Sequence, residues 1–109
     1  MKKKALLALV ALLSSVSAHA QMSYAEGSHL MTKYGCSSCH ALDQPMKGPA
    51  LVDIARRYVS DPNAIEYLSI HVHNGSVGAW GPLVMPPVDV PDDELQAMIR
   101  WIMKLPLQP

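Results

Sequence analysis

Apolar residues recur at helical spacing in four segments of the chain, and these segments predict four helices. They run from Ser23 to about Tyr34, from Ala50 to Tyr58, from near Pro62 to Asn74, and onward from about Pro91. The last segment has the i, i+3/i+4, i+7 stripe of a helix that faces a core, formed by Leu95, Met98, Ile99 and Ile102. Strand signals are poor throughout. The pattern therefore predicts a small all-α domain.

Residues at the ends of these segments support their boundaries. Ser23 and Glu26 have the spacing of a capping box, in which a hydroxyl and a carboxylate satisfy the first free backbone N–H groups. Gly35 suits the end of the first helix. The acidic residues at 92–94 suit the positive end of the last helix dipole.

The stretch from Gly75 to Val90 is too rich in glycine and proline for a helix or an interior strand. It predicts a long loop without secondary structure. Such loops are uncommon in small domains and are more often functional than not.

Residues 1–20 have the pattern of a secretory signal peptide. Lysines at 2–4 precede an apolar run at 5–13, and an A-x-A cleavage site ends at Ala20. We expect cleavage before Gln21, with cleavage after Ala18 as the alternative, and a single domain over 21–109. As a membrane anchor the apolar run falls far short of the roughly 20 residues that a spanning helix needs. The segment therefore predicts export to the periplasm.

Removal of this segment changes the charge of the protein. The whole chain has nine basic and nine acidic residues, and three of the basic ones are the lysines at 2–4. The mature chain therefore has six basic against nine acidic residues, a formal charge of −3. Its basic residues are scattered, whereas binding to nucleic acid needs a clustered basic face. We expect no nucleic-acid partner and no membrane association after cleavage.

Cys36-Ser37-Ser38-Cys39-His40 is the pattern of covalent c-type haem attachment. Two thiols three residues apart fall on one side of the backbone, where both can form thioethers with the vinyl groups of one porphyrin edge. His40 can then turn its imidazole onto the iron. The alternatives are a redox dithiol or half of a zinc site. The chain has no third cysteine for zinc, and a redox dithiol needs no adjacent histidine.

Met85 is our candidate for the second axial ligand of the iron. The chain has seven methionines, and the alternative for each is packing in the core. Among them only Met85 lies on the long loop and is followed at once by prolines that stiffen it. Ligation by histidine and methionine is the arrangement that cytochromes c use.

These features together resemble small bacterial class I cytochromes c of the cytochrome c-551/c-552 type. The resemblance runs from about Leu30 to Lys104 and rests on an ordered set of motifs: Cys36-x-x-Cys39-His40, Gly48-Pro49-Ala50, Asn74-Gly75-Ser76, Trp80-Gly81-Pro82 and Met85-Pro86-Pro87. It implies four to five short helices wrapped around one haem c, attached through Cys36 and Cys39, with the first and last helices crossing. It also implies a monomeric carrier of single electrons in the periplasm.

The resemblance assigns roles to two further residues. Pro49 matches the proline whose carbonyl accepts a hydrogen bond from Nδ1–H of the ligand histidine, here His40. Trp80 matches the tryptophan whose indole reaches a haem propionate, with simple packing as the alternative. For Trp101, in the last helix, packing is the preferred interpretation.

Two positions depart from the family pattern. Val88 stands where related proteins often have an asparagine that hydrogen-bonds the sulfur of the ligand methionine. His71 stands where the family has arginine or histidine beside a propionate, and an imidazole there would titrate near neutral pH. The alternative for His71, as for His73 and His29, is a solvated helix residue.

A haem with both axial positions filled has no open site for substrate, so the sequence predicts a shuttle of single electrons and not an enzyme. Transient redox protein partners would dock around Cys36 and the Met85 loop through a small interface. Two alternatives remain open. In one, the chain is the haem subunit of a larger periplasmic oxidoreductase, although it ends soon after the last helix without an evident docking extension. If Met85 does not bind, an open iron would make a peroxidase or a gas sensor.

Overall fold

The computed structural model describes residues 21–107, so the expected signal peptide lies outside the described residues. The described chain forms four α-helices, one two-stranded sheet and two short 3-10 helices. In chain order these elements are α1 (Tyr24–Lys33), η1 (Cys36–Ser38), α2 (Leu51–Tyr58), α3 (Ala64–Asn74), β1 (Ser76–Gly78), β2 (Gly81–Met85), α4 (Asp92–Met103) and η2 (Leu105–Leu107). The four predicted helices are present, and the capping box of Ser23 and Glu26 forms with both of its hydrogen bonds.

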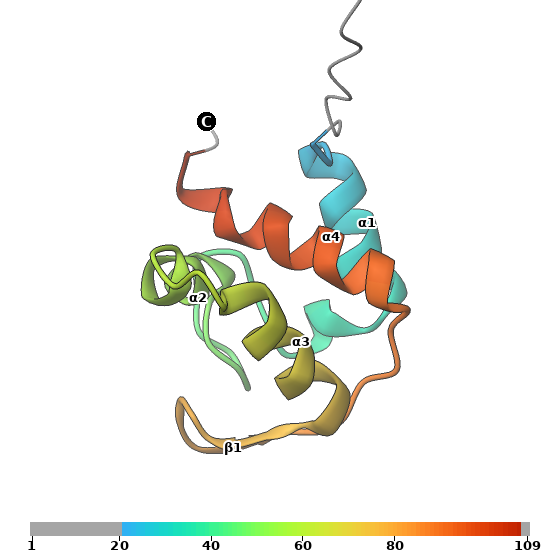
Figure 1. The fold of residues 1–109 in the computed structure, drawn as a ribbon. Coiled ribbons are helices and arrows are strands. Elements are labelled where there is room, and N and C mark those ends of the chain that lie inside the picture. The colour runs from blue at the N-terminus through green and yellow to red at the C-terminus, as the bar shows by residue number, and fades with distance from the viewer. Residues whose placement is uncertain (1–20, 108–109) are drawn as a thin grey trace, which may run out of the picture.

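Helix α4 is the centre of the packing, since it contacts α1, α2 and α3. Figure 1 shows it crossing α1, with α2 and α3 below. Its apolar stripe is buried as predicted, together with side chains from the other helices and the connecting segments. The buried core consists of Met31, Leu51, Ala55, Val90, Leu95, Met98, Ile99, Trp101, Ile102 and Leu105.

The crossing of α1 and α4 depends on one close approach. Trp101 is 2% exposed, which agrees with the packing interpretation, and its indole lies directly against the backbone of Gly27. A Cβ atom on Gly27 would lie 2.2 Å from Trp101 Cε2. The indole N–H has no hydrogen-bond partner among the described residues, so Trp101 stabilises the crossing through its packing.

The prediction of a loop without secondary structure between Gly75 and Val90 is wrong for the first part of that stretch. Strands β1 and β2 form an antiparallel hairpin in which Ser76 pairs with Met85 and Val77 with Val84. Both strands lie at an edge, where Pro82 need not donate to a neighbouring strand. Gly78 and Gly81 supply the positive φ angles, 78° and 102°, that a tight reversal requires.

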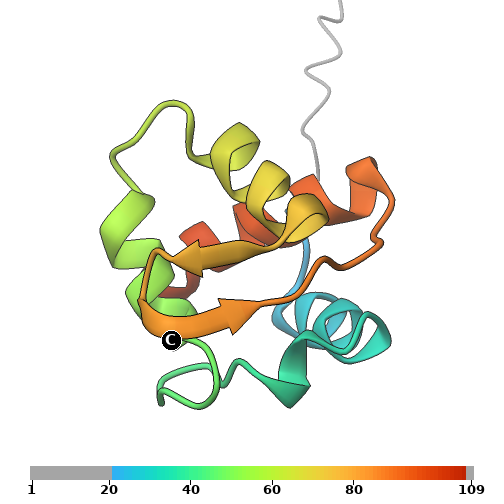
Figure 2. The same cartoon turned by 90° about the horizontal axis from the view of Figure 1, so that it is seen from below.

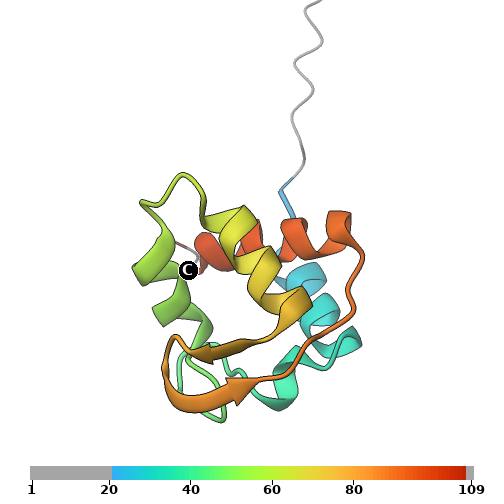
Figure 3. The ribbon, with the colours of Figure 1, turned by 60° about the horizontal axis from the view of Figure 1, so that its bottom comes forward.

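The hairpin closes one side of a ring of elements. Viewed from below, it lies across the opening between α2, α3 and the segment that follows η1 (Figure 2). Figure 3 shows the same elements arranged in a ring, with α4 behind them. Side chains from the helices, the hairpin and the loop after η1 line one interior site.

A polar contact joins the end of α1 to the start of α4. The Tyr34 hydroxyl donates to Glu94 Oε2, and Lys33 Nζ lies 3.3 Å from Glu94 Oε1. The hydrogen bond from Tyr34, with the nearby Lys33 ammonium, holds the pKa of Glu94 below its usual value of 4.5. The same contact raises the pKa of Tyr34. These groups tie the helix that precedes Cys36 to the central helix.

We expect Gly27→Ala to lower the free energy of unfolding by about 1–3 kcal/mol, the usual cost of overpacking. The clash with Trp101 should outweigh the roughly 1 kcal/mol that alanine gains over glycine in a helix. Denaturant unfolding of the intact protein measures this change, with the exposed His29→Ala on the same helix as the control. Equal midpoints for Gly27→Ala and wild type would contradict the close approach.

We expect the contact at Glu94 to make stability depend on pH. A lowered pKa in the folded state means that the stabilisation is fully present above about pH 4.5 and is lost as pH falls through the folded value. Glu94→Gln should therefore flatten the fall in thermal midpoint on acidification. Asp93→Asn, which removes a carboxylate at the same end of α4, should leave that fall nearly intact.

Candidate haem-binding site

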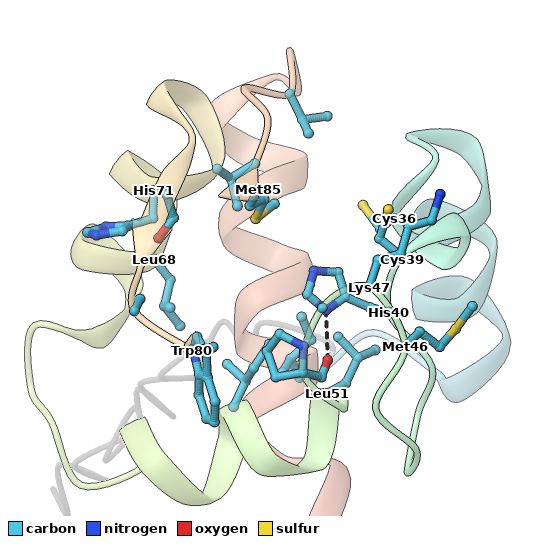
Figure 4. Close-up of a pocket in the computed structure, with 18 of the residues that line it drawn as sticks. Cys36, Cys39, His40, Met46, Lys47, Leu51, Leu68, His71, Trp80 and Met85 are labelled. Atoms are coloured by element: carbon cyan, nitrogen blue, oxygen red, sulfur yellow. Dashed lines mark hydrogen bonds between the residues drawn. The ribbon is translucent and has the colours of Figure 1, made fainter. Parts of the chain in front are cut away.

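The interior site is a cavity of about 710 Å³, within the size range of ligand and cofactor pockets. Its walls are mostly apolar side chains from α2, α3, α4 and the hairpin, among them Leu51, Ile54, Leu68, Leu83, Met98 and Ile99. Every site residue predicted from the sequence lines it: Cys36, Cys39, His40, Pro49, His71, Trp80 and Met85. Figure 4 shows how these side chains converge on the cavity from separate elements.

Cys36 and Cys39 are brought together by the single turn of η1. Gly35 precedes this turn with a φ of 74°, and the backbone N–H groups of Cys39 and His40 both donate to the carbonyl of Cys36, at 3.1 and 2.9 Å. Both thiols are free and half-buried, and their sulfurs lie near each other in Figure 4. Burial raises the pKa of the Cys36 thiol. A redox dithiol needs a lowered thiol pKa, so this environment disfavours that alternative.

His40 is fixed on two sides. Its Nδ1 lies 2.8 Å from the carbonyl oxygen of Pro49, so Nδ1–H donates and Nε2 is the ring nitrogen left to bind a metal. Gly48 packs against the ring, where a Cβ atom would lie 2.5 Å from Cε1. The backbone N–H of Gly48 donates to the carbonyl of Cys39 at 2.8 Å, which ties this loop to the cysteine turn.

Met85 reaches the cavity from the end of β2. Its backbone lies against Gly75, where a Cβ atom would lie 2.8 Å from the Met85 carbonyl oxygen. Just beyond it, the N–H of Val88 donates to the carbonyl of Val72 at 2.8 Å and fastens the strand to α3. The Val88 side chain packs against the core and offers no hydrogen-bond donor. Two other methionines, Met31 and Met98, are buried in the core.

Trp80 and His71 also border the cavity. His71 Nδ1 lies 2.8 Å from the carbonyl oxygen of Tyr67, and the rings of these two residues are 4.1 Å apart. His71 is therefore held at the cavity wall. His73, two residues later on α3, bonds Asp92 through Nε2 at 2.8 Å. Trp80 remains 39% exposed, with the guanidinium of Arg57 stacked over its ring.

Sequence reasoning missed the roles of three residues near the site. Gly48 belongs to the Gly48-Pro49-Ala50 motif, but its contact with the His40 ring forms only when the chain folds back onto His40. Tyr58 and Tyr67 stack on each other at 5.5 Å beside the cavity. Their positions on α2 and α3 gave no signal of this pairing, because it joins two separate helices.

The donor set fits a covalently bound haem. Two thiols lie on one side of an apolar cavity, an imidazole is oriented by its second nitrogen, and a thioether enters from another strand. The glycine beside His40 leaves the room that a flat imidazole needs. A structural zinc site requires four ligands, and the described residues contain no cluster of three or more histidine, cysteine or acidic side chains suited to a metal ion.

Comparisons with known proteins agree with this site. The model of the family named Cytochrome c matches residues 24–106. Cytochrome c-551 of Pseudomonas aeruginosa is 40% identical over 97 residues, which cover 88% of this chain and 93% of the relative. Cytochrome c-552 of Hydrogenobacter thermophilus is 34% identical over 105 residues, covering 96% and 99%. The crystal structure of wild-type Nitrosomonas europaea cytochrome c552 aligns with a TM-score of 0.68 at 39% identity, over 72% of this chain and 98% of that one.

We expect Gly48→Val to displace the His40 ring and to break its hydrogen bond to Pro49. The branched side chain would occupy the space that the ring fills, and the hydrogen bond to Pro49 opposes a shift of the ring. The yield of haem-loaded protein per folded chain should fall, as measured by absorbance against protein concentration. The exposed Lys47→Val, one position earlier, is the matched control and should load as wild type does.

Proposed function

Because the chain belongs to the cytochrome c family, we propose that it is a periplasmic carrier of single electrons with one haem c bound by Cys36, Cys39, His40 and Met85. The family carries covalently attached haem c, and the relatives are small electron-transfer cytochromes. The observation that carries the finer assignment is one cavity that holds two free thiols, an oriented imidazole and a thioether.

The bound haem supplies a one-electron couple. Cys36 and Cys39 hold it as thioethers on one side of the cavity. His40 offers Nε2, and the hydrogen bond from its Nδ1 to Pro49 fixes the ring and makes Nε2 more basic. Met85 offers a soft thioether, which raises the reduction potential relative to a second histidine. Apolar side chains such as Leu68 and Ile99 keep water away from the iron.

His71 and Trp80 contribute at the polar edge of the same cavity. The Trp80 indole N–H is the proposed hydrogen-bond donor to a haem propionate. His71 is also proposed to lie beside a haem propionate. Val88 supplies no hydrogen bond to the Met85 sulfur, so the sulfur is oriented by the hairpin and by packing. A protonated His71 disfavours the oxidised, more positive iron.

Export follows from residues 1–20, which we propose to be a cleaved signal peptide. Among the described helices, none has the length and apolar content that crossing a membrane requires. Redox partners would dock transiently near Cys36 and the hairpin. The chain after residue 20 has only three lysines, which argues against strong electrostatic attraction to an acidic partner.

Spectroscopy of the protein expressed in the periplasm tests haem attachment and both ligands. We expect the weak near-infrared band of methionine-bound ferric haem, and no reaction of the reduced protein with carbon monoxide. Met85→Ala should lose the band, bind carbon monoxide and show a lower reduction potential. The control is Met46→Ala. Met46 also borders the cavity, but it lies in the segment that follows His40 and not on the hairpin. Carbon monoxide binding by the wild type would favour a peroxidase or gas sensor instead.

A further inference from the structure

The hairpin that ends in Met85 is weakly anchored to the rest of the protein. Its two strands pair mainly with each other. Val77 is 77% exposed, and Leu83 and Val84 line the cavity. A segment with few contacts to the rest of the chain opens locally at low free-energy cost. Specific contacts at its two ends must therefore hold it.

The base of the hairpin is held by backbone contacts. Val88 N–H donates to the Val72 carbonyl on α3, and Gly75 packs against the backbone of Met85 and against Pro87. These contacts act on the residues that flank Met85 along the chain. They leave the far end of the hairpin, the turn at Ala79 and Trp80, without support from α3.

A side chain from α2 donates a hydrogen bond to the turn. Arg57 Nη1 donates to the carbonyl oxygen of Ala79 at 2.8 Å. The same guanidinium stacks over the Trp80 ring, 4.5 Å from its centroid, and lies 5.4 Å from the centroid of Tyr58. Trp80 in turn meets Tyr58 edge-on at 6.5 Å. One planar cation thus joins the turn carbonyl and two aromatic rings.

We propose that Arg57 is a positioning residue that clamps the hairpin turn to α2 and thereby keeps Met85 in place as a ligand. This inference rests on the proposed function of Met85. Strand β2 runs from the turn to Met85 in five residues and pairs with β1 at Gly81, Val84 and Met85, so movement at the turn is transmitted to the thioether. The flat guanidinium is suited to this role, because it donates in its plane and stacks on its face.

The neighbouring arginine shows what an ordinary surface arginine does on the same helix. Arg56 Nη1 bonds Asp53 Oδ1 at 3.0 Å, one turn back along α2, and both side chains are largely exposed. The hydrogen bond of Arg56 therefore stays within α2, whereas that of Arg57 reaches the hairpin turn, although the two residues carry the same charge at adjacent positions.

The test compares Arg57→Gln with Arg56→Gln in the haem-loaded ferric protein, with added imidazole as a competitor for the Met85 position. Loss of a charge-assisted hydrogen bond and a cation–π contact should raise the apparent affinity for imidazole about tenfold in Arg57→Gln. Arg56→Gln should bind imidazole as wild type does. Arg57→Lys keeps the positive charge but lacks the planar guanidinium. It should therefore recover less than half of the difference in imidazole affinity between Arg57→Gln and wild type.

Any other result contradicts the proposed role of Arg57. Equal imidazole affinities for Arg57→Gln and Arg56→Gln would remove the role of Arg57, and full recovery by Arg57→Lys would leave only an effect of charge. Gly27→Ala, which destabilises the distant α1–α4 crossing, controls for general loosening. An equal rise in its imidazole affinity would assign the effect to global stability. A wild-type protein without the near-infrared methionine band would overturn the proposed ligand and the clamp together, whereas the band with unchanged affinities overturns the clamp alone.

Discussion

The packing of Trp101 against Gly27 is the constraint on which the other parts of the structure depend. It brings α1 directly onto α4, and α4 also forms the surface on which α2 and α3 pack. The end of α1 leads through Gly35 into the cysteine turn, so the position of this crossing sets where the thiols lie. A Cβ atom at position 27 would clash with the Trp101 ring and loosen this crossing.

The two sides of the cavity are built in different ways. On the His40 side, the cysteine turn, Gly48 and Pro49 are joined by short hydrogen bonds and close contacts within residues 36–49. On the Met85 side, the proposed ligand stands on a hairpin that contacts α3 through Val88 and α2 through Arg57. The first arrangement suits permanent attachment of a cofactor. The second would leave the proposed bond to the thioether sensitive to the protein around it, which is where a carrier would adjust its potential.

The hairpin also shows where sequence reasoning failed. Glycine and proline between Gly75 and Val90 exclude a helix and a central strand, and that conclusion is correct. They do not exclude a short edge hairpin, whose turn uses the positive φ angles of Gly78 and Gly81 and whose edge tolerates Pro82. The contact of Arg57 with Ala79 and Trp80 joins residues more than twenty positions apart, and no local pattern marks it.

The sequence by itself determined the four helices, the burial of the α4 stripe and the turn that carries Cys36, Cys39 and His40. Those features follow from local spacing: the 3.6-residue period of a helix, the capping box, and two cysteines with histidine on one turn. The tertiary structure decided which of the nearby residues support the site. The approach of Gly48 to His40, of Gly27 to Trp101 and of Arg57 to the hairpin turn arises only when distant segments meet, because close packing depends on the shape of both partners.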